Sequence, residues 1–289
     1  MTIDSALKIG YQNLKTNSSI DDYAYEAERI LGFILKKSRE FLLTHPELKI
    51  TSSQAKLYKK LLQRRLNNWP LAYLTNQRSF YGLDFYVDKN ALIPRPETEI
   101  LVEDIIALAK NKKSATIIDI GTGSGAIIIS LAKNLTGANY QFYGLDISIK
   151  ALGVAKKNAK IQNLKNIKFH KSNLLSFILS HPKILEFSSD LIIAANLPYL
   201  TPAQVNNSPT IKKEPRLALV AGSDGLKYYR ELFTQIKNLE TLKNITIICE
   251  IDPSQDKSLS ELAQNNWPKA QIQIKNDLAG LSRFVTIKM

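Results

Sequence analysis

The spacing of hydrophobic residues changes along the chain, and each spacing predicts a different kind of element. Residues 1 to about 75 are predicted to be helical, with one amphipathic helix capped by Asp21-Asp22 and a second running from Thr51 to Trp69-Pro70. Their inward-facing residues are predicted to be Tyr25, Ile30, Leu31 and Ile34, then Leu57, Leu61, Leu62 and Leu66. The basic residues of the second helix are predicted to form a solvated face: Lys56, Lys59, Lys60, Arg64 and Arg65.

The pattern becomes typical of β-structure between Ser79 and Ile93. Aromatic and β-branched residues from Phe80 to Val87 surround a glycine, which predicts a β-hairpin at 76–94 that joins two domains. Two prolines stiffen the stretch 92–99, and its acidic residues suit the first turn of a helix through Leu101, Ile105 and Leu108. This stretch is either a rigid linker or a loop that lies over an active site.

Apolar strands alternate with helices over the remaining domain, 95–289. Strands are predicted at 115–120, 140–145, 167–170, 190–196 and 245–251, followed by two closing strands at 270–276 and 283–288. Helices are predicted between them at 126–132, 148–162, 224–239 and 255–265, with a polar loop at 200–223. This order predicts an α/β, Rossmann-like domain with a mostly parallel seven-stranded sheet, preceded by a small helical bundle.

Composition narrows the class of protein. The chain has 289 residues, of which 44% are hydrophobic and 22% charged, as in ordinary globular proteins. Cys249 is the only cysteine, so no disulfide can form within the chain, and we expect it to be a small buried hydrophobe. With only three histidines besides, no metal site is expected. The N-terminus does not resemble a signal peptide and no apolar run is long enough to span a membrane, so we expect a cytoplasmic protein without a membrane partner.

The net charge is strongly positive. Lys and Arg total 39 against 26 Asp and Glu, a formal charge of +13, and the excess is spread along the chain. Such a surplus is compatible with transient contact with RNA or the ribosome, but it also fits a Lys-rich composition that only confers solubility.

The stretch 190–199 carries the most specific chemistry. An apolar strand ends at Asn196-Leu197-Pro198-Tyr199, at the edge where parallel sheets bind ligands. The Asn196 side-chain oxygen and the Leu197 carbonyl could accept the two N–H hydrogens of a planar amide or amino group and aim its lone pair at an electrophile. Pro198 fixes the backbone and Tyr199 offers a flat apolar face. An ordinary exit from a strand into a turn would use the same residue types.

A glycine-rich turn and an acid indicate a nucleoside cofactor. The turn Gly121-Thr122-Gly123-Ser124-Gly125 lies between a strand that contains Asp119 and a helix, and its spacing differs from both dinucleotide and P-loop fingerprints. Asp146 ends the second strand, where an acid typically binds ribose hydroxyls, although it could equally cap the helix that starts near Ser148.

Taken together, these motifs resemble a class I S-adenosylmethionine-dependent methyltransferase. Four stretches more narrowly resemble the HemK/PrmC family, which methylates the side-chain amide of the glutamine in the Gly-Gly-Gln motif of peptide chain release factors. They are Leu92 to Glu99, Asp119 to Ile127, Glu214 to Leu219 and Gly222 to Leu226. The resemblance implies S-adenosyl-L-methionine as cofactor, release factors as substrates, a helical N-terminal domain for substrate recognition, and a monomer.

The resemblance also implies roles for individual residues. The cofactor would be bound by Asp119, Gly121, Thr122, Gly123, Ser124, Gly125, Asp146, Asn173, Leu174 and Asn196. Gly121 to Gly125 would pass beside its methionine part, Asp146 would hold its ribose, and Asn173-Leu174 would flank its adenine. The catalytic and substrate-binding residues would be Asn196, Leu197, Pro198 and Tyr199, with Arg95 also on the substrate side.

Two departures from the family pattern leave other functions open. The family has Asn-Pro-Pro-Tyr where this chain has Leu197 in the second position, and Asn-Leu-Pro-Tyr is also typical of rRNA adenine dimethyltransferases. Asn173-Leu174 replaces an Asp followed by an aromatic residue. An amino methyltransferase for RNA or DNA is therefore a second hypothesis, and a non-catalytic module that binds the cofactor or a partner is a third.

Overall fold

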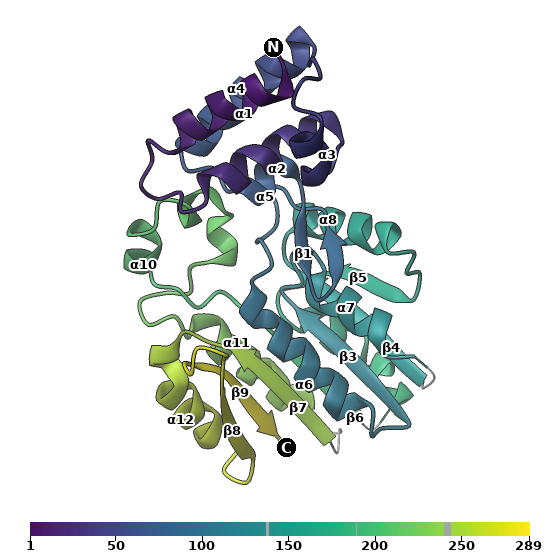
Figure 1. Ribbon diagram of the computed structural model, residues 1–289. Helices are drawn as coiled ribbons and strands as arrows, with labels where there is room; N and C mark the ends of the chain where they lie inside the picture. The colour runs from purple at the N-terminus through teal and green to yellow at the C-terminus, as the bar shows by residue number, and fades with distance from the viewer. Residues whose placement is uncertain (137–138, 189, 240–243) are drawn as a thin grey trace. The chain divides into compact units, whose positions relative to one another are not determined.

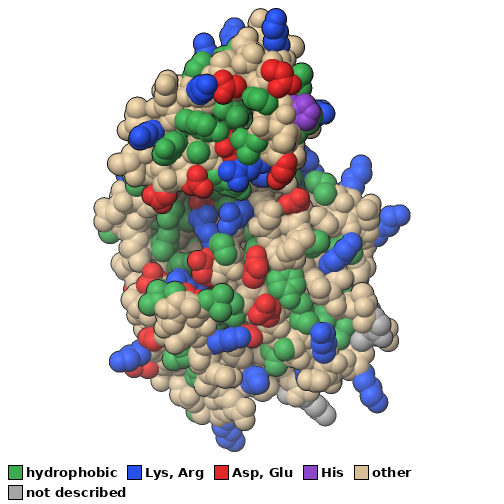
Figure 2. Space-filling model, viewed as in Figure 1, with side chains coloured by type: hydrophobic (Ala, Val, Ile, Leu, Met, Phe, Trp, Pro, Cys, Tyr) green, Lys and Arg blue, Asp and Glu red, His purple; other side chains and the backbone are tan. Residues whose placement is uncertain are grey.

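The computed structural model describes residues 1–136, 139–188, 190–239 and 244–289 (Figure 1). The chain forms two compact units, one of residues 1–77 with 209–213 and the other of residues 78–208 with 214–289. On the face drawn in Figure 2, Lys and Arg side chains are scattered over both units and do not form one dense block. Among the described residues, no helix combines the length and the apolar character needed to cross a membrane.

The first unit is a bundle of short helices with polar caps. Its helices are α1 (Ile3–Leu14), α2 (Tyr23–Leu35), α3 (Arg39–Thr44), α4 (Ser52–Leu66) and α5 (Leu71–Thr75). Side chains of Thr2, Asp22, Ser38 and Thr51 each accept a hydrogen bond from the first turn of the helix that follows. The predicted starts after Asp22 and Thr51 are thus confirmed, whereas the sequence patterns gave no individual prediction of α1 or α3.

Three predicted orientations in this unit are wrong. Tyr25 and Leu57 were expected to face inward, but they are 40% and 42% exposed. In α4 the buried stripe begins one residue later, at Tyr58, whose ring is large enough to reach across the bundle and whose hydroxyl donates to the Ala27 carbonyl over 3.3 Å. Arg65 was expected on the solvated face, but it is buried because it pairs with Glu26 of α2.

The second unit contains a seven-stranded sheet of order β5-β4-β3-β6-β7-β9-β8. The strands are β3 (Ser114–Ile120), β4 (Asn139–Asp146), β5 (Ile167–Lys171), β6 (Asp190–Ala195), β7 (Asn244–Glu250), β8 (Gln271–Asn276) and β9 (Ser282–Lys288). The strands β3 to β7 pair in parallel, and β9 pairs antiparallel with both β7 and β8, which confirms the mostly parallel sheet. Because the chain passes from β3 to β4 on one side and later returns to β6 on the other, the strand order reverses next to β3, which creates a ligand crevice.

Helices cover both faces of this sheet (Figure 1). One hydrophobic core joins the sheet to α6 (Glu99–Ala109), α7 (Ala126–Asn134), α8 (Ile149–Ile161) and the hairpin β1 (Arg78–Phe80) and β2 (Leu83–Phe85). The other joins it to α9 (Ser176–Leu179), α11 (Lys227–Ile236) and α12 (Asp256–Asn266). Alternate residues of β3 serve the two cores, with Ile117 in the first and Ile118 in the second.

The stretch 200–223 differs from the polar loop that was predicted. It contains α10 (Pro202–Asn206) and 3-10 turns at Ile211–Lys213 and Arg216–Ala218. The helix forms because the Thr201 and Gln204 side chains make a capping box and Pro202 occupies the first helical position. Cys249 is fully buried, as expected.

Candidate active site

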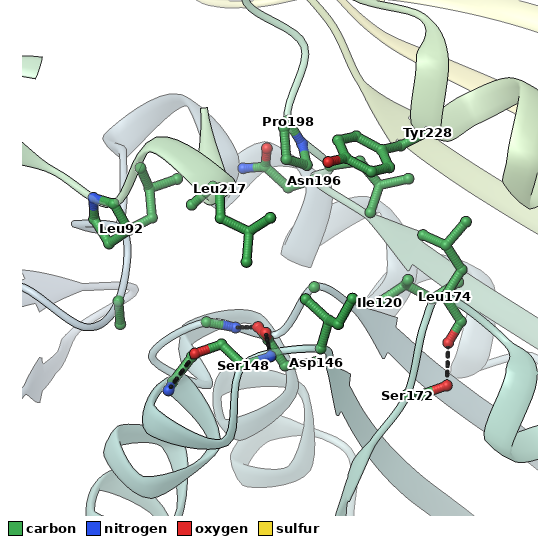
Figure 3. Close-up of a pocket in the computed structure, with 18 of the residues that line it drawn as sticks. Leu92, Ile120, Asp146, Ser148, Ser172, Leu174, Asn196, Pro198, Leu217 and Tyr228 are labelled. Atoms are coloured by element: carbon green, nitrogen blue, oxygen red, sulfur yellow. Dashed lines mark hydrogen bonds between the residues drawn. The ribbon is translucent and has the colours of Figure 1, made fainter. Parts of the chain in front are cut away.

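A pocket lies beyond the carboxyl ends of β3, β4, β5 and β6, where the sheet topology predicts a ligand site. The empty space at this site, open mouth included, is about 830 Å³. Figure 3 shows Asn196 and Pro198 on one side of the pocket and Asp146 and Ser148 on the opposite side, with Ile120 between them. The pocket therefore unites the two motifs that the sequence singled out.

The glycine-rich turn brings the backbone close to the pocket. Gly121, Gly123 and Gly125 have φ values of 70°, 55° and 81°, a conformation that other residues adopt only with strain. A Cβ on Gly121 would meet the Leu197 side chain at 3.5 Å, an ordinary contact, so the backbone conformation is what favours glycine here. Gly121 and Gly123 line the pocket, whereas Thr122, Ser124 and Gly125 form the base of the turn.

Asp146 is held by backbone amides and faces the pocket. Its two oxygens accept hydrogen bonds from the amides of Gly123 and Ser148 over 2.9 and 2.8 Å. Burial raises the pKa of this carboxyl, although both amides act to lower it. Each oxygen retains a second lone pair, so the carboxylate can still accept from two neighbouring hydroxyls of a ligand. The residue that caps α8 is Ser148, and the alternative that Asp146 is the cap is wrong.

Asp119 lies beneath the turn and has no exposed surface. Its Oδ2 atom accepts from the Thr122 hydroxyl over 2.6 Å. Burial raises its pKa to about 7, because that hydrogen bond and the Ile128 amide only partly offset the loss of solvation. Asp119 does not line the pocket; it supports the turn that does.

Asn173 and Leu174 form the wall at the end of β5. Leu174 has a φ of 51°, an unusual backbone conformation for a non-glycine residue. Its carbonyl accepts from the Ser172 hydroxyl over 2.6 Å, which secures the turn. Tyr228 of α11 lines the same pocket and gives this side an aromatic ring that the sequence motifs did not identify (Figure 3).

Asn196 is oriented by two buried residues. Its Nδ2 group donates to the Thr98 hydroxyl over 3.1 Å and to Glu250 Oε2 over 2.9 Å. Thr98 in turn donates to the same Glu250 oxygen over 2.6 Å. Glu250 is 1% exposed, and burial raises its pKa to about 7. Among the described residues, none donates to Asn196 Oδ1, so this oxygen remains an acceptor for a ligand.

Tyr199 takes a different position from the one expected for it. Its side chain does not line the pocket, and its hydroxyl donates to Glu250 Oε1 over 3.3 Å. The single hydroxyl hydrogen of Tyr229 of α11 is shared between the Ala195 carbonyl, 3.0 Å away, and the Glu250 carbonyl. Burial raises the pKa of the Tyr229 hydroxyl well above its usual value. The Leu197 amide is directed at this hydroxyl and lowers the pKa by a smaller amount.

Sequence reasoning missed Glu250, Thr98 and Tyr229. Two signals were available: Thr98 lies within the stretch 92–99 that resembles the family, and Glu250 ends a strand predicted to lie in the same sheet as Asn196.

Two loops close another side of the pocket, where Leu92 and Leu217 line it. The buried Glu214 carboxylate joins these loops, because it accepts from the Arg95 guanidinium over 2.5 Å and from the Ile93 amide over 3.1 Å. Arg95, expected on the substrate side, is thus engaged in an ion pair and does not line the pocket.

Comparison with known proteins places this arrangement in context. Residues 111–281 match the family model "Methyltransferase domain", and residues 5–75 match "PrmC N-terminal domain". A release factor glutamine methyltransferase of Bacillus cereus is 32% identical, with both chains covered completely. The protein of the same name from Coxiella burnetii is 33% identical over 100% of this chain and 99% of its own. The crystal structure of the hMettl16 catalytic domain in complex with MAT2A 3'UTR hairpin 6 shares the fold, with a TM-score of 0.51 at 18% identity over 84% of this chain and 83% of that one.

Proposed function

This chain belongs to the release factor glutamine methyltransferase family, and from that premise we propose that it methylates the side-chain amide nitrogen of the Gly-Gly-Gln glutamine in a peptide chain release factor, with S-adenosyl-L-methionine as methyl donor. The observation that carries the proposal is the hydrogen bonding of the Asn196 side-chain amide. Both hydrogens of its amide are engaged by Thr98 and Glu250, and its oxygen is left as an acceptor beside the pocket.

An amide nitrogen needs help to act as a nucleophile, because its lone pair is delocalised. Asn196 Oδ1 and the Leu197 carbonyl would each accept one N–H of the glutamine amide and turn the lone pair toward the methyl group. The new N–C bond would form as the S–C bond of the sulfonium breaks, and the surplus amide proton would pass to solvent. Pro198 would limit the backbone freedom of the acceptors.

The opposite side of the pocket fits the cofactor. The Asp146 carboxylate has lone pairs left for two ribose hydroxyls, and the Gly121–Gly123 backbone leaves room for the methionine part. Asn173 and Leu174 would flank the adenine, and Tyr228 adds an aromatic surface nearby. Asp119, Thr122, Ser124 and Gly125 would act by shaping the turn. S-adenosyl-L-methionine would supply the electrophilic methyl group.

The remaining parts of the chain are assigned by analogy with the relatives. We propose that the helical unit of residues 1–77 contributes to recognition of the release factor and that the reaction occurs in the cytoplasm, where translation ends. The net charge of +13 would favour transient contact with RNA or the ribosome.

A methyl-transfer assay with a choice of acceptors tests the proposal. Purified protein and radiolabelled cofactor are incubated with a release factor, with the same factor carrying Gln→Ala in its Gly-Gly-Gln motif, or with bulk RNA. We expect label on the intact factor alone. Label on RNA instead would support an amino methyltransferase for nucleic acid, and cofactor binding without transfer to any acceptor would support a binding module.

Asn196→Ala tests the residue that carries the argument. We expect transfer to fall by at least about 100-fold, the usual scale for loss of a key transition-state acceptor, while the unfolding midpoint stays close to the wild-type value and cofactor binding remains detectable. Near-normal turnover of this variant would refute the role of Asn196 as an acceptor for the glutamine amide.

A further inference from the structure

The orientation of the Asn196 side chain is a property that the chain must control. The oxygen and the NH2 group of an amide have nearly the same shape, so packing alone does not decide which end faces a ligand. Only the oxygen can accept a hydrogen bond from the glutamine amide. Asn196 turned by 180° would present N–H groups to N–H groups, and the substrate would lose an acceptor.

We propose that Glu250 and Thr98 are positioning residues that lock Asn196 with Oδ1 toward the substrate amide. This inference rests on the proposed function and deepens it, because it assigns to two residues outside the pocket the selection of the reactive orientation. Neither residue lines the pocket, and both act through Asn196.

The directions of the hydrogen bonds leave one arrangement. An ionised Glu250 is only an acceptor, and its Oε2 atom takes the Thr98 hydroxyl hydrogen and one Asn196 hydrogen. Since the single hydrogen of Thr98 is used in this way, its oxygen can only accept from the second Asn196 hydrogen. Reversal of Asn196 would set its oxygen against the carboxylate and against this hydroxyl oxygen, in a site where none of the three residues has more than partial exposure.

The fold brings these three groups together from distant parts of the chain. Ala195 of β6 pairs in register with Cys249 of the neighbouring parallel strand β7, so Asn196 and Glu250 are the next residues at the same edge of the sheet. Thr98 ends the 3-10 turn before α6 and is 3% exposed. Tyr199 donates to the second oxygen of Glu250 and limits rotation of the carboxylate.

The orientation of the Asn196 side chain is expected to depend on pH, because burial raises the pKa of Glu250 to about 7. The charged and titratable side chains that act on it or on Tyr199 come from the surrounding elements and are Glu97, Arg95, Arg283, Tyr199 and Tyr229. Protonation would convert the acceptor-only carboxylate into a group that can also donate, so the reversed Asn196 would gain a partner. Turnover should therefore decline as the pH falls through about 7.

Glu250→Gln and Thr98→Val test the lock, with Thr98→Ser as the matched control that keeps the hydroxyl. We expect kcat for release-factor methylation to fall roughly 10- to 100-fold in the first two variants, the effect of losing a hydrogen bond to a charged group, and to stay within about threefold in Thr98→Ser. KM for the factor and the cofactor Kd should change little. The decline of kcat toward acid pH should be absent in Glu250→Gln. Wild-type kcat and an unchanged pH profile in both variants would overturn the proposal.

Hydrogen exchange of the Asn196 side-chain NH2 group, assigned by NMR with Asn196→Asp as reference, gives a readout that needs no acceptor. We expect slow exchange in the wild type and in Thr98→Ser and faster exchange in Glu250→Gln and Thr98→Val. If the wild-type protein methylates no release factor, the proposed function fails, while slow exchange would still support the lock. Equal exchange rates in all four proteins would refute the lock even where methylation is normal.

Discussion

Replacement of Gly125 by alanine should destabilise the second unit (residues 78–208 with 214–289, here called the catalytic unit), and the structure gives two separate contributions to this loss of stability. Gly125 precedes α7 with a φ of 81°, in the left-handed region. A Cβ there would lie 2.8 Å from Ile129 Cδ1, 3.2 Å from Ala155 Cβ and 3.3 Å from Ala155 Cα. The Ile129 contact is with the end of a flexible side chain, but the Ala155 contacts are with α8 itself and cannot be relieved without moving a helix.

Two terms add in this variant. The left-handed conformation costs an alanine roughly 1–2 kcal/mol. Overpacking against a fixed neighbour typically costs about 1–3 kcal/mol more. Gly125→Ala should therefore lower the free energy of unfolding by roughly 2–5 kcal/mol, and the shift of α7 against α8 should also weaken cofactor binding.

Two other glycines separate the terms. Gly82 has a φ of 71° but open space around it, so Gly82→Ala should show the backbone term alone. Gly153 lies within α8 with ordinary φ and open space, so Gly153→Ala should stabilise by roughly 0.5–1 kcal/mol. All three glycines belong to the same compact unit, which makes the comparison direct.

Urea unfolding measures these differences. Trp267 packs against Phe233 in this unit at 4.9 Å between ring centroids, so its fluorescence in a Trp69→Phe background reports on the catalytic unit and not on the helical one. The cofactor Kd is measured in parallel. If Gly125→Ala and Gly82→Ala destabilise equally, the argument that Gly125 is required for helix packing is wrong.

Two further predictions concern Asp119 and Leu197. The pKa of Asp119 is about 7 in the folded protein and 3.8 as its reference value, so between pH 3.8 and 7 the folded state binds more protons than the unfolded state. The contribution of Asp119 to the free energy of unfolding therefore falls as the pH rises, by roughly 4 kcal/mol in total. Urea midpoints of Asp119→Asn, which keeps an acceptor for Thr122, should thus lose less between pH 5 and 7 than those of the wild type; parallel curves would contradict this. Leu197→Pro removes the amide directed at Tyr229 and a 3%-exposed side chain but keeps the backbone carbonyl. We expect the free energy of unfolding to fall by about 1–3 kcal/mol and the rate of methyl transfer to stay within tenfold of the wild type. Loss of all methyl transfer with normal cofactor binding would contradict this, because it would show that proline at position 197 does not keep the carbonyl in place.

The features that the sequence predicts well are those in which a residue type is tied to a local conformation. Three glycines in five positions between a strand and a helix restrict the backbone to a tight turn, and the structure has positive φ at each of them. The apolar runs of β3 and β6 could be recognised as buried strands because both faces of a parallel sheet are covered. The helix α10 carried an equally local signal in Thr201, Pro202 and Gln204, so a closer inspection of capping patterns would have found it.

Features that depend on side-chain direction are predicted less well. Leu57 and Tyr58 are adjacent apolar residues, and helical periodicity alone does not decide which of them the neighbouring helix covers. Arg65 belonged to a basic run, yet Glu26 from a different helix makes its burial favourable. In each case the deciding partner lies more than 30 residues away in the chain.

The same limit separates the recognition of Asn196 from an understanding of how it works. Its residue type and its place after β6 are enough to predict an amide at the ligand-binding edge of the sheet. Which end of that amide faces the ligand depends on Glu250, 54 residues later, and on Thr98, 98 residues earlier. Thr98 lies in the stretch 92–99 that resembles the family, but nothing in that stretch marks it as a partner of Asn196, and a buried acid at the end of a strand is common on its own. The role of Glu250 arises from the register of β6 against β7, and the role of Thr98 from the place of the turn before α6. Motifs alone therefore identify the group that touches the substrate and miss the groups that orient it.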